Sequence, residues 1–166
     1  LAFARQLLKL HGEVSGLPER DRLTPLLEAL PAEPAQWGSL HVEVADTNEG
    51  KTLSGFTRRF HPLLEQALVE SGRLTEDASL PRLHIFFPAE DRALIASSDP
   101  ANSSDAHMGI HRVAMSTDAP SRSYLKLGEA FAVFLSEKEQ ARLLKPQITA
   151  VDLGAAPGGW TWVLAS

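Results

Sequence analysis

The sequence has no cysteine, no long hydrophobic run and no excess of basic residues, and each absence excludes a class of protein. Without cysteine, disulfide frameworks, thiolate metal sites and cysteine nucleophiles are excluded, and a reducing compartment, the cytoplasm, is the expected location. No apolar run approaches the ~20 residues that span a bilayer, so we expect no membrane partner. The chain carries 16 lysines and arginines against 21 aspartates and glutamates, and this acidic balance excludes a polybasic nucleic-acid arm.

The composition that remains is that of a folded protein, with 43% hydrophobic and 22% charged residues. The 166 residues are enough to form one or two hydrophobic cores. The chain does not begin with methionine and ends inside an apolar segment, so we expect a piece of a longer protein. We expect it to be a monomer.

Hydrophobic periodicity predicts an α+β domain in roughly the first 100 residues. Leucines at helical spacing predict a short amphipathic helix within 17–31, whereas residues 40–44 alternate as a strand does. Residues 83–87 and 93–97 are expected to be buried strands. Residues 3–14 fit a helix and a strand equally well, so periodicity leaves them open. The resulting order of strand, long helix, strand and strand predicts helices that cover one face of a sheet.

The long helix between the first two of these strands carries its own start and stop signals. Asp46 is a candidate N-cap, and Glu49, three residues later, can complete a capping box. Pro62 is expected to kink or break the helix. Gly72 is well placed to end it as the C-terminal cap.

Residues 98–122 are rich in Ser, Asp, Asn, Pro and Gly, which predicts a linker or a system of surface loops. A second helix is expected around an apolar face formed by Leu127, Ala130, Phe131 and Phe134. Ser136 and Glu139 then form a capping box for a short helix that must stop before Pro146.

The most informative segment is a predicted strand over 148–153, followed by a glycine-rich loop and a helix that begins near Trp160. In open α/β sheets a nucleotide-like ligand lies at the end of such a strand, against backbone N–H groups that glycine leaves uncovered. A simple strand-to-helix turn is the alternative interpretation of the same residues.

The order of residues in this loop, D-x-G-x-x-P-G-G, resembles the first motif of class I S-adenosylmethionine methyltransferases. The stretch VDLGAAPGGWT is similar to the loop of the FtsJ-like (FtsJ/RlmE) ribose 2′-O-methyltransferases. The resemblance implies S-adenosylmethionine as cofactor, with Asp152 near its ammonium group and the loop backbone around its methionine end, at Gly154, Pro157, Gly158 and Gly159. A capping role is the alternative for Asp152.

Longer stretches, in the same order along the chain, resemble the RlmM-type enzymes: HVEVADTNEGK, DAPSRSYLKLGEAFAVF and AVDLGAAPGGWTW. These enzymes methylate a cytidine ribose of bacterial 23S ribosomal RNA, which is therefore the implied partner. The resemblance implies a ferredoxin-like and THUMP RNA-recognition domain over 1–105 and a linker over 106–122. Residues 123–166 are then the start of a Rossmann-like α/β methyltransferase domain.

Within this family pattern, Lys126 matches the first catalytic lysine, which can orient the ribose 2′-hydroxyl and remove its proton. Ser123 matches a cofactor-contacting serine, and Ala156 matches a loop contact that is a cysteine in some relatives. Gly128 stands where the pattern has a glutamate. The other catalytic residues and the acid that holds the cofactor ribose are expected after residue 166, so we expect this piece to be inactive. For Lys126 the alternative is a solvated charge on a helix surface.

Two small groups of arginines are candidate contacts to RNA phosphates, because such contacts supply most of the affinity for RNA. The segment 106–126 carries three basic residues against one acidic residue, and Arg112 and Arg122 lie in it. Arg58 and Arg59 form the second group, on the predicted long helix. Ordinary surface charge is the alternative for both groups.

No metal is expected, although His107 and His111 are four residues apart. Gly109 lies between them and the sequence suggests no third ligand. Two other functions compete with the methyltransferase interpretation. One is a noncatalytic RNA-binding THUMP-type module with a vestigial loop, and the other is a methyltransferase for a small molecule.

Overall fold

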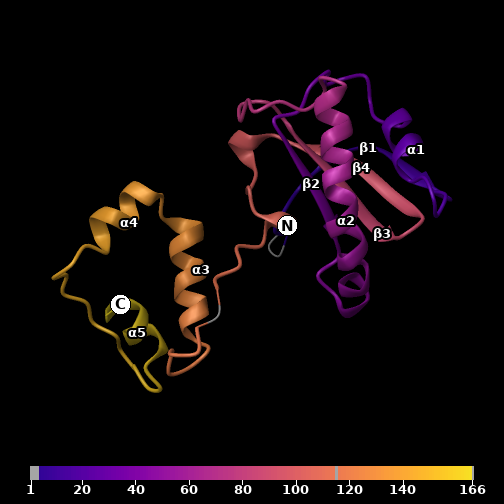
Figure 1. Cartoon of the computed structure of the whole chain (residues 1–166). Coiled ribbons are helices and arrows are strands. Elements are labelled where there is room, and N and C mark those ends of the chain that lie inside the picture. The colour runs from indigo at the N-terminus through magenta and orange to yellow at the C-terminus, as the bar shows by residue number, and fades with distance from the viewer. Residues whose placement is uncertain (1–3, 115, 166) are drawn as a thin grey trace. The chain divides into compact units, whose positions relative to one another are not determined.

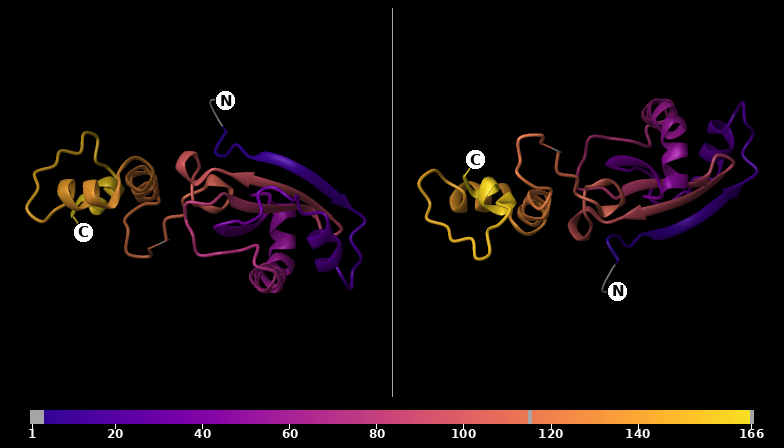
Figure 2. Two further views of the ribbon diagram at one scale, coloured as in Figure 1. Left: turned by 90° about the horizontal axis from the view of Figure 1, so that it is seen from above. Right: turned by 90° about the horizontal axis from the view of Figure 1, so that it is seen from below.

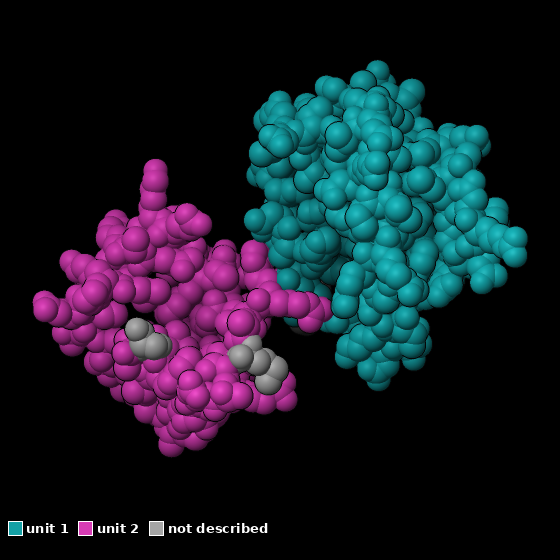
Figure 3. Space-filling model, in the orientation of Figure 1, with its two compact units in different colours: residues 1–110 teal, residues 111–166 magenta. Residues whose placement is uncertain are grey.

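The computed structural model describes residues 4–114 and 116–165. The chain forms two compact units, one ending at Ile110 and the other beginning at His111 (Figure 3). The first unit contains a four-stranded sheet, and the second contains helices joined by irregular segments (Figure 1). None of the helices in the described part of the chain has the length and apolar character needed to cross a membrane.

The elements of the first unit follow the predicted order. They are β1 (Lys9–Ser15), α1 (Leu23–Glu28), β2 (Ser39–Val44), α2 (Asn48–Glu70), β3 (Arg82–Ala89), β4 (Arg92–Ser98) and two short 3-10 turns, η1 (Pro100–Asn102) and η2 (His107–Gly109). The sheet order is β1-β4-β3-β2. β2 and β3 are parallel and joined by α2, whereas β4 pairs antiparallel with β3 and with β1. The predicted strands and helices of this unit are therefore confirmed.

Pairing with β4 settles the second part of the segment that periodicity left open, because residues 9–15 form a strand, whereas residues 4–8 form neither a helix nor a strand. Residue 3, which belonged to that ambiguous pattern, lies outside the described residues. Glycine and histidine in this strand interrupt the alternation of apolar and polar residues that would indicate a strand. The strand is instead stabilised by its hydrogen bonds to β4.

Both helices of the first unit lie on the same face of the sheet (Figure 2). Alternate strand residues point to this face, and Leu83, Ile85 and Phe87 of β3 are fully buried there. Leu26 of α1 and Leu64 of α2 are buried in the same core. The same alternation sends the residues between them, among them His84, to the opposite face of the sheet.

The start of α2 differs from the prediction, because Thr47 and not Asp46 is the N-cap. The Thr47 hydroxyl accepts a hydrogen bond from the Gly50 N–H at 3.0 Å. A Cβ added at Gly50 would lie 1.9 Å from the Ala45 carbonyl oxygen, so the chain turns as tightly as glycine allows at this point. This close approach fixes Thr47 as the last extended residue before the helix.

The predicted break at Pro62 is also wrong, since α2 continues through it to Glu70. Pro62 is exposed, and Leu64 and Leu68 on the opposite side of the helix are fully buried, so packing holds the helix together. The predicted stop at Gly72 is confirmed. Gly72 has φ +70°, its N–H donates to the Val69 carbonyl, and the Arg73 N–H donates to the Leu68 carbonyl, as in a Schellman motif.

The second unit contains α3 (Tyr124–Phe134), α4 (Glu137–Leu143) and α5 (Gly159–Ala165). The capping box of Ser136 and Glu139 is confirmed. Phe134, predicted on the apolar face of α3, is the last residue of that helix and is 79% exposed.

The predicted strand over 148–153 is not formed, and Val151 and Leu153 are 77% and 90% exposed. A strand needs the backbone groups of a neighbouring strand, and the described residues from 111 to 165 provide none.

Candidate functional site

The glycine-rich loop is a chain of tight turns that ends in the first turn of α5. Gly154 and Gly158 have φ +78° and +94°, a region that side chains with a Cβ rarely adopt. The Gly158 N–H donates to the Ala155 carbonyl at 2.5 Å, and the Trp162 N–H donates to the Gly158 carbonyl at 2.8 Å. The loop therefore passes directly into the helix.

The loop packs against the start of α3, which brings together two segments that are far apart in the sequence. A Cβ added at Gly159 would lie 2.2 Å from Ser123 Oγ, so only glycine permits this contact. Trp160 Nε1 donates to the Ser123 carbonyl at 3.1 Å. The rings of Tyr124 and Trp162 meet edge to face with centroids 5.3 Å apart.

A hollow of about 300 Å³ lies where these segments meet, and we call it the loop hollow. All the predicted catalytic and cofactor-binding residues line it except Gly158 and Gly159, which serve the turn and the packing on α3. The complete lining is Ser123, Lys126, Asp152, Leu153, Gly154, Ala155, Ala156, Pro157 and Trp160.

Three kinds of polar group reach the loop hollow. The carboxylate of Asp152 accepts a hydrogen bond from the Thr161 hydroxyl at 2.8 Å, which orients it from the side of α5. The hydroxyls of Ser123 and Ser121 are 2.6 Å apart. Lys126 is exposed in the first turn of α3. The hollow thus combines a carboxylate, a hydroxyl and an amine with a loop of accessible backbone groups.

The predicted RNA-binding arginines fall in different units. Arg58 and Arg59 are exposed on α2 in the first unit, and Arg112 and Arg122 are exposed in the second. Arg59 also borders a hollow of about 350 Å³ at the junction of α1 and α2, next to Phe56 and Phe60.

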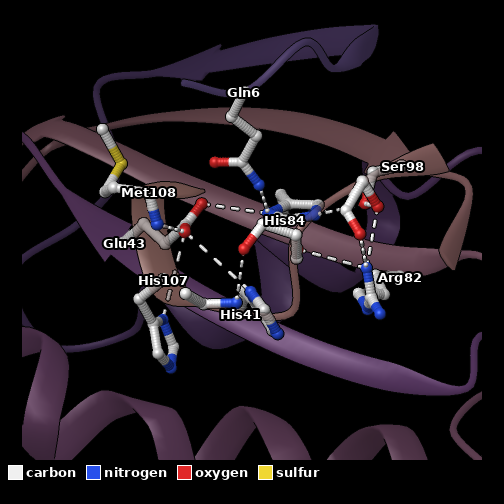
Figure 4. A network of polar contacts seen from close by, with 11 residues as sticks. Gln6, His41, Glu43, Arg82, His84, Ser98, His107 and Met108 are labelled. Carbon is white, nitrogen blue, oxygen red and sulfur yellow. Dashed lines mark hydrogen bonds and ion pairs between the residues drawn. The ribbon is translucent and has the colours of Figure 1, made fainter. Parts of the chain in front are cut away.

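Sequence reasoning missed a buried polar cluster on the sheet face opposite α2 (Figure 4). Glu43 is 3% exposed and His84 is fully buried. His84 Nδ1 lies 3.0 Å from Glu43 Oε2, and His84 Nε2 lies 2.8 Å from the Ser98 hydroxyl. His41 belongs to the same cluster, and its ring stacks on that of His107 with centroids 4.6 Å apart.

The two central groups of this cluster have shifted pKa values. Burial, reinforced by the neighbouring His107 and His84, lowers the pKa of His41 to about 4. Burial opposes ionisation of Glu43, but hydrogen bonds from His84 and from the Met108 N–H outweigh it and lower the pKa of that carboxyl. A signal was present in the sequence, because histidine and glutamate alternate with apolar residues in LHVEV, which puts both on one face.

Comparison with known proteins relates the segment that contains the loop to a family of methyltransferases. Residues 119–166, which contain the loop and α3, match the family model of the FtsJ-like methyltransferases. The second unit is therefore related to the methyltransferases.

Matches to the rest of the chain identify one family within this class. Residues 21–99 match the model of the N-terminal part of ribosomal RNA large subunit methyltransferase M. Proteins of that name from Laribacter hongkongensis and Tolumonas auensis are 52% and 49% identical over 99% of this chain, which covers 46% and 45% of their lengths. The chain belongs to this family and spans about half the length of the curated relatives that it matches.

Proposed function

We propose that the chain is part of an enzyme that transfers a methyl group from S-adenosylmethionine to the 2′-hydroxyl of a cytidine ribose in 23S ribosomal RNA. The observation that carries the proposal is the loop hollow, which is lined by Lys126 and by all the predicted cofactor residues except Gly158 and Gly159. Similarity to ribosomal RNA methyltransferases along nearly the whole chain supports it.

The residues around the loop hollow fit the amino-acid end of the cofactor. The Asp152 carboxylate suits its ammonium group, and the Ser123 hydroxyl and loop N–H groups suit its carboxylate. At Gly154 an added Cβ would meet nothing within 4 Å, so the backbone there is open to a ligand. Bound S-adenosylmethionine supplies the electrophilic methyl group.

Lys126 is the proposed catalytic residue of this chain. It lines the same hollow as the cofactor residues, one helical turn or less from Ser123. In its neutral form the amine orients the ribose hydroxyl by accepting its hydrogen bond, and then takes its proton as the oxygen attacks.

The first unit is the proposed RNA-recognition domain, of the ferredoxin-like and THUMP type, over residues 1–105. We place a linker at 106–122 and the Rossmann-like domain at 123–166, and the unit boundary after Ile110 supports this division. Exposed arginines supply the proposed phosphate contacts, namely Arg58, Arg59, Arg112 and Arg122.

The test is single-turnover methylation of a 23S ribosomal RNA transcript by the full-length protein, with labelled cofactor. Lys126→Ala should lower the methyl-transfer rate by about 10² or more, the usual scale of general base catalysis, with little change in cofactor affinity. Lys126→Arg should not restore the rate, because a guanidinium stays protonated. Lys138→Ala on α4 is the matched control and should be fully active.

Near-normal turnover by either Lys126 variant would show that Lys126 is an ordinary surface charge with no catalytic role. RNA binding without any methyl transfer by the full-length protein would favour the noncatalytic module. Methylation of a small molecule with no RNA affinity would favour the second alternative function.

A further inference from the structure

We propose that His41, Glu43 and His107 form a binding site for a divalent transition-metal ion of the zinc type. The site lies on the sheet face opposite α2 and is separate from the loop hollow, so it is independent of the proposed methyl transfer. The sequence predicts no metal and considers only the pair of His107 and His111. The fold instead brings His107 to two residues more than sixty positions away.

The first argument is the geometry of the three side chains (Figure 4). β2 presents His41 and Glu43 on one face, and η2 brings His107 over it. His41 Nδ1 and His107 Nδ1 lie 3.9 Å and 4.0 Å from Glu43 Oε1. One ligand atom from each residue lies within 4.8 Å of the other two.

These separations are close to those that a bound ion requires. For atoms at most 4.8 Å apart, a point exists within about 2.8 Å of all three, and zinc bonds nitrogen and oxygen at about 2.0–2.2 Å. Each ligand atom therefore has to move inward by less than about 1 Å, and the His107 ring has to turn out of its stack on His41 so that both nitrogen lone pairs point at one ion. His107 is 63% exposed and can make this movement by rotating its side chain.

The second argument is an unpartnered polar atom inside the cluster. His41 is only 8% exposed, and its Nδ1 is buried with no hydrogen-bond partner among the described residues. It faces a carboxylate oxygen at 3.9 Å, beyond hydrogen-bond distance. Buried polar atoms are nearly always satisfied, and a cation between the imidazole and the carboxylate would satisfy this one.

The third argument is the support behind the carboxylate. Glu43 Oε2 accepts from His84 Nδ1, and the other ring nitrogen of His84 is held by Ser98. The Met108 N–H donates to Glu43 Oε1. Metal-binding carboxylates are oriented by such outer hydrogen bonds. Two histidines and one carboxylate match the ligand set of zinc sites in which water completes the coordination.

The experiment titrates ZnCl₂ and CoCl₂ into the complete 166-residue chain, prepared without affinity-tag histidines. We expect one ion per chain by calorimetry, and visible absorption bands with Co²⁺ that report tetrahedral or five-fold coordination. His107→Phe and His41→Phe keep the aromatic stack but remove one ligand each, and should weaken binding at least tenfold.

His61→Phe is the matched control, because His61 lies 3.8 Å from Glu65 on α2 and belongs to no group of three ligand residues in the described part of the chain. Its replacement should leave ion binding unchanged. His107 is exposed, so its variant should keep the circular dichroism of the parent and stay informative even if the His41 variant unfolds. The proposal is wrong if the parent binds no ion in a one-to-one ratio, or if the His107 variant binds as tightly as the parent.

Discussion

The two glycines that end the loop are needed for different physical reasons. Gly158 has φ +94°, so any side chain there strains the backbone, although an added Cβ would meet only Pro120 Cγ at 3.7 Å. At Gly159 the conflict is spatial, because an added Cβ would lie 2.2 Å from Ser123 Oγ. One glycine shapes the loop, and the other lets α3 approach it.

Gly158→Val should therefore distort the loop and raise the Kd for S-adenosylmethionine in the full-length protein by more than tenfold, that is, by more than about 1.4 kcal/mol in binding free energy. Calorimetric titration measures the Kd. Gly55→Val is the control, since Gly55 lies in α2 of the first unit with nothing within 4 Å of an added Cβ. Unchanged affinity in the Gly158 variant would show that the loop is only a turn.

At the scale of the element, α2 shows how packing overrules local preference. It runs from Asn48 to Glu70 through a proline, because its buried face is anchored on the sheet. Its ends, by contrast, depend on single residues. Thr47 accepts the hydrogen bond that begins the helix, and Gly72 takes the left-handed conformation that ends it.

One substitution at two glycines of this region should change stability in opposite directions. Gly72→Ala should reduce the free energy of unfolding by about 1–2 kcal/mol, because φ is +70° there. Gly55→Ala should increase it by up to about 1 kcal/mol, because alanine is the better helix former and an added Cβ meets no neighbour. Urea denaturation followed by circular dichroism gives both values. If both substitutions changed the free energy of unfolding in the same direction, Gly72 would not be the end of the helix.

Whether the segment 148–153 forms a strand depends on whether a neighbouring strand is present to pair with it. Its backbone has no strand partner in the described chain, so its amides should exchange with solvent much faster than those of β3. In the full-length protein we expect the same amides to be protected, as a paired strand. Hydrogen exchange with mass spectrometry compares the two. Protection in the 166-residue chain would contradict the structure, and rapid exchange in both proteins would contradict the predicted strand.

At the scale of the whole molecule, each unit stabilises its site differently. The first unit buries a continuous core between its sheet and two helices, and places a polar cluster on the other face. The second unit holds its loop mainly through the contacts of α5 with α3 and leaves Leu153 almost fully exposed. The core of the second unit is correspondingly small.

We expect the 166-residue chain to bind S-adenosylmethionine much more weakly than the full-length protein does. Among the residues that the structure describes, the loop hollow is lined by two short segments, which suit the methionine end of the cofactor but provide no residues to contact its adenosine. Titration calorimetry on both proteins tests this. A micromolar Kd for the 166-residue chain would mean that these residues form a complete cofactor site.

The sequence by itself determined the features that depend on neighbouring residues. Periodicity predicted α1, α2, β2, β3 and β4, and the capping box of α4 and the glycine end of α2 were predicted correctly. The candidate loop followed from the order of residues in one short motif, and the family followed from several longer stretches in the same order along the chain. These signals are local, because helix faces, strand alternation and caps involve residues a few positions apart.

Only the tertiary structure decided what depends on distant partners. Pairing with β4 made residues 9–15 a strand, and the lack of a partner left 148–153 irregular. Close packing at Gly50 made Thr47 rather than Asp46 the N-cap of α2, and burial of one face allowed α2 to continue through Pro62. Likewise, His107 lies close to His41 and Glu43 only because η2 packs against β2 of the sheet. Hydrogen bonds and packing between distant segments have no period in the sequence, so they appear only once the chain is folded.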